Sequence, residues 1–358
     1  MRRILVTLAM TFAVLLGTAA PASAHNVAGV GGTNLRTRLT AVTPPLAGLT
    51  VKVIEVGSRL ELRNTAKEEV LVLGYSGEPY LRVGPGGVFQ NRRSPAVYLN
   101  VSRKGTTNVP ADADAAAPPE WQKVSGGQVA RWHDHRVHWM NSQDPPAARR
   151  DPGKTHVIFP EWKVEMRYGP GPQAIPVVAT GDLVWVPGPS ALPWILLIVA
   201  FTLVGGLLIV RSRNWAGALA GALVLLVLVD VFHNVGLAFA SAGTTVDHLG
   251  RFVVTSILSI PVWAVAVLAV RWLSRRDLDG ALAANFAALF IALLGGLSDV
   301  AVLYRSQAPF AFPTILVRLA VALTVGLGGA VLVGSGLLLV RRPEDAKPSV
   351  LSATPAPG

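Results

Sequence analysis

The sequence contains no cysteine in its 358 residues. The chain therefore has neither disulfide bonds nor thiolate ligands, which excludes iron–sulfur clusters and zinc sites built on cysteine. Charged residues are also scarce, at 15%, whereas hydrophobic residues make up 51% and the mean hydropathy is +0.46. This composition is too apolar for an ordinary soluble protein of this length, and it indicates membrane-spanning segments.

The sequence also lacks a nucleic-acid-binding pattern and a catalytic motif. Its net charge is +11, but the basic residues are not interleaved with aromatic residues, so nucleic acid is not an expected partner. A basic excess in a membrane protein is typical of arginines held in cytoplasmic loops. The sequence also lacks an evident nucleophile–base pair or paired-carboxylate motif, and we therefore expect no enzyme activity.

The first 24 residues have the pattern of a secretory signal peptide. Arg2 and Arg3 precede a short apolar run, and Ala22-Ser23-Ala24 is a small-residue cleavage site. Cleavage there would make His25 the first residue of the mature chain. An N-terminal histidine offers its amine and its ring to one metal ion, a nitrogen-rich chelate that favours Cu(II). The alternative is that cleavage falls before a histidine by chance.

Residues 25–190 are predicted to form an all-β extracytoplasmic domain. Residues 161–168 alternate strictly between charged and apolar side chains, and residues 59–63, 69–73 and 183–186 are shorter candidate strands. Such runs, separated by Gly and Pro, are typical of a sandwich or barrel. Two segments rich in Pro and Ala, 105–120 and 141–154, are expected to be surface loops.

About five membrane spans are predicted after the β domain, forming a helical bundle over residues 191–342. Each apolar segment is close to the length needed to cross a bilayer. The segments are 193–210, 215–240, 252–273, 281–304 and 314–340. Basic residues follow the first, third and fifth segments, which predicts a cytoplasmic C-terminus and places residues 25–190 outside, as the signal peptide also requires. Residues 343–358 are expected to be a disordered cytoplasmic tail.

The segment 130–140, with the sequence ARWHDHRVHWM, concentrates histidines outside the predicted spans. His133, His135 and His138 are three of the six histidines other than His25. Imidazole is the commonest metal ligand near neutral pH, and the thioether of Met140 suits Cu(I). In a straight strand His138 would face away from the other two histidines, whereas a bend after His135 would let all three converge. The alternative is a polar cross-strand cluster without metal.

A second group of polar residues falls in or beside the predicted spans, in the outer half of the membrane. Ionisable side chains are costly in lipid, so we expect this cluster to face inward and to pair. Its members are Asp230, His233, Asn234, Asp247, His248, Asp299 and Arg318. A metal, proton or small-ligand site and a purely structural ion-pair network, such as Arg318 with Asp299, are equally consistent with this pattern.

The N-terminal design, with a signal peptide that ends directly before His25, resembles copper-binding proteins of the CopC and YcnI types. The resemblance implies an Ig-like or CopC-like sandwich with His25 as a copper ligand, and the helical part that follows is similar to the membrane protein CopD. The segments 74–100 and 130–140 are similar to an uncharacterised family of actinobacterial secreted and membrane proteins, which implies no assigned activity.

The sequence thus predicts a multi-pass cell-membrane protein that binds a metal on its extracytoplasmic side, with copper favoured over zinc, and that buffers the metal or hands it to the membrane part. Copper-handling or envelope proteins are the expected partners. The alternative is a structural or interaction protein of the envelope, or an accessory subunit of a transporter, with incidental histidines.

Overall fold

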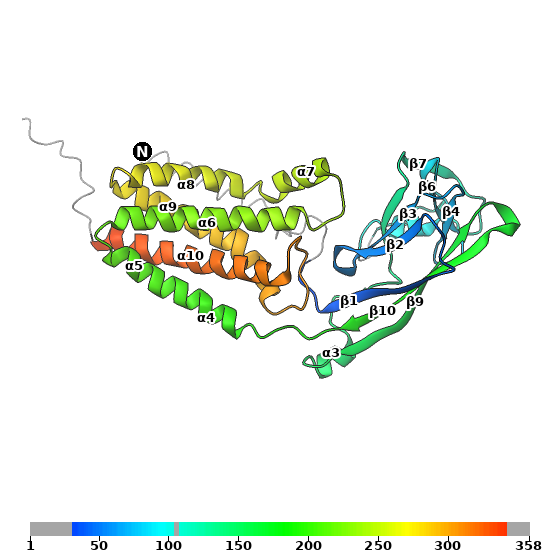
Figure 1. Cartoon of the computed structure of the whole chain (residues 1–358), viewed down its shortest axis with the longest axis horizontal. Coiled ribbons are helices and arrows are strands. Elements are labelled where there is room, and N and C mark those ends of the chain that lie inside the picture. Colours follow the sequence, from blue (N-terminus) through cyan, green and yellow to red (C-terminus); the bar gives the residue numbers. More distant parts are fainter. Residues whose placement is uncertain (1–30, 104–106, 342–358) are drawn as a thin grey trace, which may run out of the picture. The chain divides into compact units, whose positions relative to one another are not determined.

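The computed structural model describes residues 31–103 and 107–341, which divide into two compact units (Figure 1). Of the described residues, those up to Pro189 form the β unit together with Arg305–Pro309. Ser190–Tyr304 and the described residues from Phe310 to Arg341 form the helical unit. The predicted order, an antiparallel β region followed by long apolar helices, is confirmed.

The β unit contains a seven-stranded and a three-stranded antiparallel sheet. In spatial order the larger sheet consists of β1 (Leu35–Thr43), β10 (Ile175–Trp185), β9 (His156–Tyr168), β4 (Val70–Leu73), β5 (Pro79–Gly84), β6 (Gly87–Asn91) and β7 (Trp121–Ser125). The smaller sheet consists of β2 (Leu49–Ile54), β3 (Arg59–Asn64) and β8 (Val129–His133). Short helical turns are η1 (Glu55–Gly57), α2 (Pro95–Leu99), α3 (Pro146–Arg150) and η2 (Gly171–Gln173).

One hydrophobic core draws on both sheets. The alternation predicted for residues 161–168 is confirmed, because Trp162, Val164 and Met166 are 1–3% exposed while the charged residues between them face solvent. Leu60 and Leu62 of β3 are fully buried in the same core. Burying such side chains contributes about 1.5–3 kcal/mol each, which lets the β unit fold without disulfides. The predicted loop 141–154 differs from expectation in containing the short helix α3.

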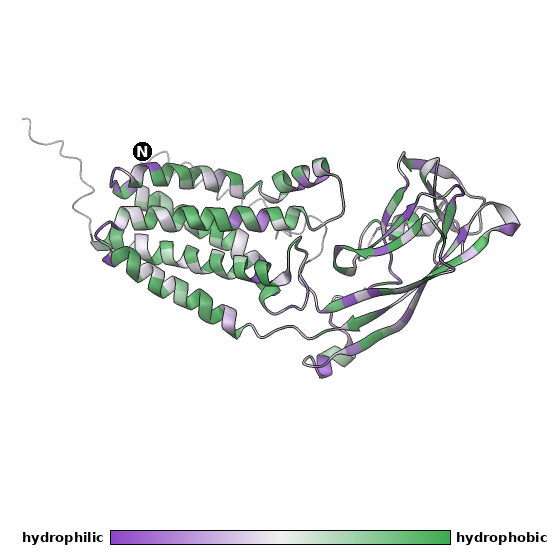
Figure 2. Cartoon of the chain, viewed as in Figure 1, coloured by the Kyte–Doolittle hydropathy of each residue, from purple (hydrophilic) through white to green (hydrophobic). Residues whose placement is uncertain are grey.

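The helical unit is built from long apolar segments (Figure 2). Its elements are α4 (Leu192–Ala200), η3 (Phe201–Gly205), α5 (Gly206–Arg211), α6 (Trp215–Ala238), α7 (Thr245–Thr255), α8 (Ser259–Leu273), α9 (Leu278–Ile291), η4 (Ala292–Gly296), η5 (Leu297–Leu303) and α10 (Thr314–Arg341). Four continuous helical segments within the described residues are long and apolar enough to cross a membrane, and the bent pair α7–α8 would make five.

Two of the predicted spans depart from a straight helix. The third is broken, because α7 and α8 meet at an angle of 68°. Pro261 has no backbone N–H, and its ring would clash with the carbonyl of Ile257 in a continuous helix, so the break falls just before α8. In the fourth span, α9 passes into the π-helix η4 and then the 3-10 helix η5. Gly295 and Gly296 lie at this change, where glycine favours a kink.

Candidate functional site

The histidine segment begins where β8 ends, at His133. A turn follows, in which the amide of Val137 donates to the carbonyl of Asp134 over 3.1 Å. Asp134 is fully buried and accepts hydrogen bonds from the indole Nε1 of Trp132, at 2.9 Å, and from Arg136. The chain therefore bends directly after the strand, and strand alternation no longer decides which way His135 and His138 point.

Tyr75 and Arg136 hold the turn against the neighbouring chain. The hydroxyl of Tyr75 accepts from the amide of His135 at 3.0 Å and donates to Oδ1 of Asn100. The guanidinium of Arg136 lies 5.2 Å from the centre of the Tyr75 ring and donates to the carbonyl of Leu73. Burial raises the pKa of Tyr75, so its hydroxyl keeps the proton that it donates.

His135 and His138 are brought together by this turn. Their ring centres are 5.5 Å apart and the rings are nearly perpendicular. Nε2 of His135 lies 3.0 Å from the carbonyl oxygen of Ser102, and Nε2 of His138 lies 2.9 Å from that of Arg103. A carbonyl only accepts hydrogen bonds, so both Nε2 atoms carry a proton, and in a neutral ring the lone pair then lies on Nδ1.

The Nδ1 atom of His138 is a buried polar atom without a hydrogen-bond partner within the described part of the chain. The side chain is only 2% exposed. Burial lowers the pKa of His138 to about 4, so the ring is neutral at pH 7. A neutral imidazole with an open lone pair is the form that binds a metal ion.

The other predicted ligands have different surroundings. Both ring nitrogens of His133 are engaged, because Nδ1 donates to the carbonyl of Ser58 at 2.8 Å and Nε2 accepts from Nε of Arg59 at 3.2 Å. Met140 is 37% exposed. His25 lies outside the described residues. Within those residues no group of three or more His, Asp or Glu side chains is placed to hold a metal.

Several of the predicted intramembrane polar residues gather within the helical unit. Asp230 and Asn234 are fully buried, and His233 is 1% exposed. Nε2 of His233 lies 3.4 Å from Oδ2 of Asp299, which joins α6 to η5. The indole Nε1 of Trp263 on α8 donates to Oδ2 of Asp230 over 2.8 Å. The predicted inward-facing cluster therefore includes these residues of α6 and η5.

Asp247 and His248 make contacts close to themselves in the chain, whereas Arg318 reaches another element. Asp247 forms a capping box with Thr244 at the start of α7. Nδ1 of His248 lies 3.3 Å from the carbonyl oxygen of Ala238, and its ring stacks on Phe239. Nε of Arg318 donates to the carbonyl of Val302 at 3.1 Å, which ties α10 to η5. The described contacts of Asp247 and His248 fix the connection between α6 and α7.

Comparisons with models of protein families, with curated proteins and with solved structures find no match to this chain. The function must therefore be argued from the residues and their geometry.

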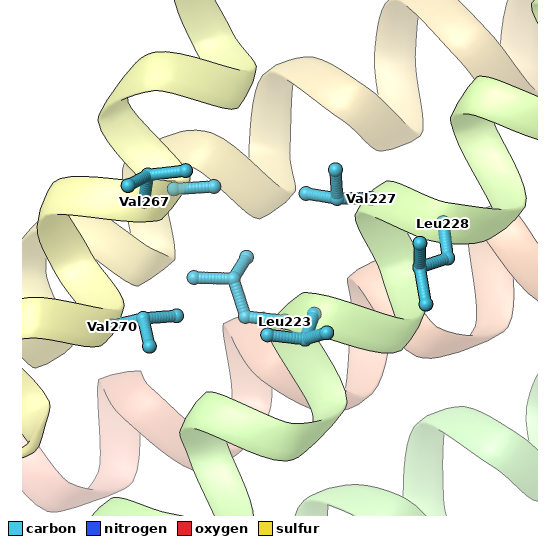
Figure 3. Close-up of a pocket in the computed structure, with 7 residues that line it drawn as sticks. Leu223, Val227, Leu228, Val267 and Val270 are labelled. Carbon is cyan, nitrogen blue, oxygen red and sulfur yellow. The ribbon is translucent and has the colours of Figure 1, made fainter.

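A cavity of about 210 Å³ lies between α6 and α8 (Figure 3). It is lined only by aliphatic side chains, including Leu223, Val227, Val267 and Val270. These side chains offer no ligand to a metal ion, so the cavity is not part of either polar site.

Sequence reasoning missed the residues that orient the two sites. The carbonyls of Ser102 and Arg103 have no side-chain signature, and Tyr75 is one aromatic residue among many in its segment. In the helical unit, Trp263 and Gly295, which lie against the carboxylate of Asp230, were also missed. Gly295 had a usable signal, because paired glycines inside an apolar segment mark a kink or a close approach.

Proposed function

We propose that this chain is a membrane-anchored protein that binds copper on its extracytoplasmic side, with the Nδ1 atoms of His135 and His138 as ligands. His25, once freed by signal cleavage, would add its amine and ring. The proposed architecture is an Ig-like or CopC-like sandwich followed in the chain by a five-span bundle.

One observation carries this proposal. Each of the two rings gives its Nε2–H to a backbone carbonyl, which is the arrangement that orients metal-binding histidines in proteins. Because a metal–nitrogen bond is about 2.0 Å long, two imidazoles on one ion hold their ring centres roughly 5 to 6 Å apart. The 5.5 Å separation of His135 and His138 agrees with that spacing.

Copper is the favoured ion for chemical reasons. Imidazole and amine nitrogens bind Cu(II) more strongly than the other divalent ions of the first transition row. The absence of cysteine removes the thiolates that many zinc sites use. Leaving Nδ1 of His138 buried without a partner costs about 1–3 kcal/mol, and a bound ion would offset that cost.

The connectivity of the chain supports a five-span topology. Arg305–Pro309 belongs to the β unit, and Gln307 forms an antiparallel bridge with Thr33. Residues 190 and 305 must then lie on one side of the membrane, so an even number of crossings separates them. The segments α4–α5, α6 and α9–η5 would give three crossings, and in the proposed topology the bent pair α7–α8 supplies the fourth.

The test is copper binding to the full-length processed protein in detergent or nanodiscs. We expect one Cu(II) per chain, with nitrogen hyperfine structure from imidazole in its electron paramagnetic resonance spectrum. The substitutions His135→Asn and His138→Asn should each weaken binding by at least about tenfold. One extra residue placed before His25 should also weaken binding, because it removes the free amine from the chelate.

His156→Asn is the matched control. Nε2 of His156 also donates to a backbone carbonyl, that of Asp151 at 2.7 Å, so this variant loses an equivalent imidazole outside the proposed site. If His135→Asn and His138→Asn, shown to be folded by circular dichroism, bind copper as the unmodified protein does, the ligand assignment is wrong. An absence of copper binding in all forms would favour the envelope interaction protein.

A further inference from the structure

The cavity between α6 and α8 is a groove on the surface of the helical unit, separate from both polar sites (Figure 3). Leu223 and Ala266 form its floor and are 0% and 2% exposed. Val224, Leu228 and Val267 form its rim and are 45–68% exposed. This α6–α8 groove therefore opens outward, on a face of the bundle that meets lipid if the helices span a membrane.

The size of the α6–α8 groove suits a hydrocarbon chain. One turn of an α-helix, 5.4 Å long and at least 10 Å across with its side chains, occupies roughly 400 Å³. The groove holds only about 210 Å³, so a helix of another chain is too wide to enter it. Its lining is entirely Leu, Val and Ala, so water would find no hydrogen-bond partner there. An empty groove would lose dispersion contacts, which an acyl chain of the bilayer restores.

One end of the groove lies next to arginine. Figure 1 shows that α6 and α8 run in opposite directions, so the start of α6 and the end of α8 lie at the same end of the groove. Gly221 lies one turn before Val224 on α6, and a Cβ atom on it would meet no atom within 4 Å. Arg271 lies one turn after Val267 on the same face of α8. The groove therefore continues, past an open position on α6, toward the helix end that carries Arg271.

The arginines at this end are available to an anion. Arg271, Arg275 and Arg276 are all exposed, and among the described residues their guanidinium groups have no hydrogen bond or ion pair. The nearest acidic residue along the chain, Asp277, caps α9 and accepts from the amide of Asp279 at 2.9 Å. A guanidinium pairs with phosphate through two parallel hydrogen bonds. The charge at this end of the groove thus complements an anionic headgroup.

We propose that the α6–α8 groove binds one anionic phospholipid, with an acyl chain in the groove and its phosphate at Arg271. The acyl chain alone gives little preference, because bulk lipid tails are as apolar as Leu and Val. The headgroup provides the preference, since basic pockets between membrane helices bind anionic headgroups. Such a lipid holds α8, the second half of the broken span, against α6. This site does not depend on copper binding in the β unit.

The test uses the full-length processed protein, purified in detergent without copper and titrated with phosphatidylglycerol or phosphatidylcholine that carry the same acyl chains. Bound lipids are counted by native mass spectrometry. We expect one phosphatidylglycerol per chain, bound roughly tenfold more tightly than phosphatidylcholine. Arg271→Gln should weaken phosphatidylglycerol binding about fivefold, which corresponds to about 1 kcal/mol for one basic residue at the membrane surface, and should leave phosphatidylcholine binding unchanged. Val267→Phe should weaken the binding of both lipids, because its ring fills the groove.

Two matched variants serve as controls. Arg211→Gln removes an exposed arginine from the last turn of α5, and Leu268→Phe adds the same ring to an exposed residue of α8 that does not line the groove. Both should bind lipid as the unmodified protein does. All four substitutions lie at exposed positions, and circular dichroism verifies that each variant is folded.

Three results would overturn the proposal directly: equal affinity of the unmodified protein for the two lipids, a preference that survives Arg271→Gln, or an equal loss in Arg211→Gln. Competition by inorganic phosphate would also overturn it, because the anion would then bind without its acyl chain. A dimer that Val267→Phe dissociates would instead make the groove a contact between two copies of the chain.

Discussion

Asp134 determines the shape of the histidine segment through its hydrogen bonds. It is fully buried, and both its oxygens accept hydrogen bonds from Arg136, with the shortest at 2.7 Å. Oδ2 also accepts the indole N–H of Trp132. Removing one partner of such a buried pair leaves an uncompensated charge, which costs about 3–5 kcal/mol. The positions of His135 and His138 therefore depend on a carboxylate that is not among the proposed copper ligands.

The neutral state of His138 predicts a pH dependence of stability. Burial lowers its pKa from 6.5 to about 4, so below pH 6.5 the unfolded chain binds a proton that the folded chain does not. The contribution of neutral His138 to the free energy of unfolding is fully present above pH 6.5. It is lost as the pH falls toward 4, and the loss is at most roughly 3 kcal/mol. His138→Phe should flatten this dependence, measured by denaturant unfolding of the metal-free protein at pH 7 and pH 4.5.

His156→Asn is measured in parallel as the control variant, because it removes a histidine that lies outside the proposed copper site. The burial of His133 lowers its pKa and contributes with the same sign, so some pH dependence will remain in His138→Phe. An equal loss of stability between pH 7 and pH 4.5 in His138→Phe and the unmodified protein would show that His138 titrates normally.

Among the elements, α10 packs against its neighbours through small residues. A Cβ on Gly326 would lie 2.8 Å from Cβ of Phe201, and one on Gly334 would lie 2.8 Å from Cγ2 of Ile209. The missing side chains let α10 approach η3 and α5 closely. Gly326 and Gly334 lie eight residues apart, so they share one face of α10, as is typical of such a contact.

The bent pair α7–α8 carries the topology prediction. Because the native chain has no cysteine, a single introduced thiol gives an unambiguous label. Thr245→Cys, at the start of α7, should react with a membrane-impermeant maleimide on the same side as the β unit. Ser274→Cys, after α8, should react only when the membrane is opened, because Arg271, Arg275 and Arg276 around it are typical of the cytoplasmic side.

Ser190→Cys and Ser212→Cys serve as references for the two sides, since they precede α4 and follow α5. If Ser274→Cys is labelled in intact cells as readily as Thr245→Cys, then α7–α8 turns back within the membrane. In that case the chain crosses the membrane four times in all, and the arrangement of Arg305–Pro309 with the β unit must be rejected.

At the scale of the whole molecule, the chain passes between its two units three times. Arg305–Pro309, which connects η5 to α10, belongs to the β unit. The amides of Thr33 and Gln307 each donate to the other's carbonyl, at 3.0 and 2.9 Å, and the amide of Ser306 donates to Oδ1 of Asn34 at 2.8 Å. A short segment distant in sequence therefore completes the edge of the β unit before β1.

Replacing Arg305–Pro309 by a Gly/Ser segment of equal length should destabilise this edge. Net hydrogen-bond contributions of about 0.5–1.5 kcal/mol each give an expected loss of roughly 1–3 kcal/mol in the local opening free energy. Hydrogen exchange should show lost protection at the Thr33 amide. Protection at Val88, in the hairpin of β5 and β6, should remain unchanged, and an unchanged Thr33 amide would contradict the pairing.

Much of the fold could be predicted from local pattern. Trp162, Val164 and Met166 are buried as their alternation predicts, since period two is a property of any strand with one face in a core. The helical segments could be found because the bilayer requires long apolar stretches. The break before α8 was not predicted, although Pro261 carries the signal for it.

The candidate sites could be predicted only in part. The histidines near residue 135 and the polar residues of α6 were identified because their residue types are rare in such surroundings. Which of them meet depends on partners distant in the chain, such as the carbonyls of Ser102 and Arg103 and the glycine at position 295. Backbone carbonyls occur at every residue, so sequence gives no sign of the ones that orient a ring.

The sequence by itself determined that the chain has a β region and long apolar helices, because hydrophobic periodicity and run length are local quantities. Only the tertiary structure decided that His133 is fully hydrogen-bonded, that the ring centres of His135 and His138 lie 5.5 Å apart, and that Arg305–Pro309 joins the β unit. Each of these depends on hydrogen bonds between residues far apart in the chain, and the geometry of such bonds exists only once the chain is folded.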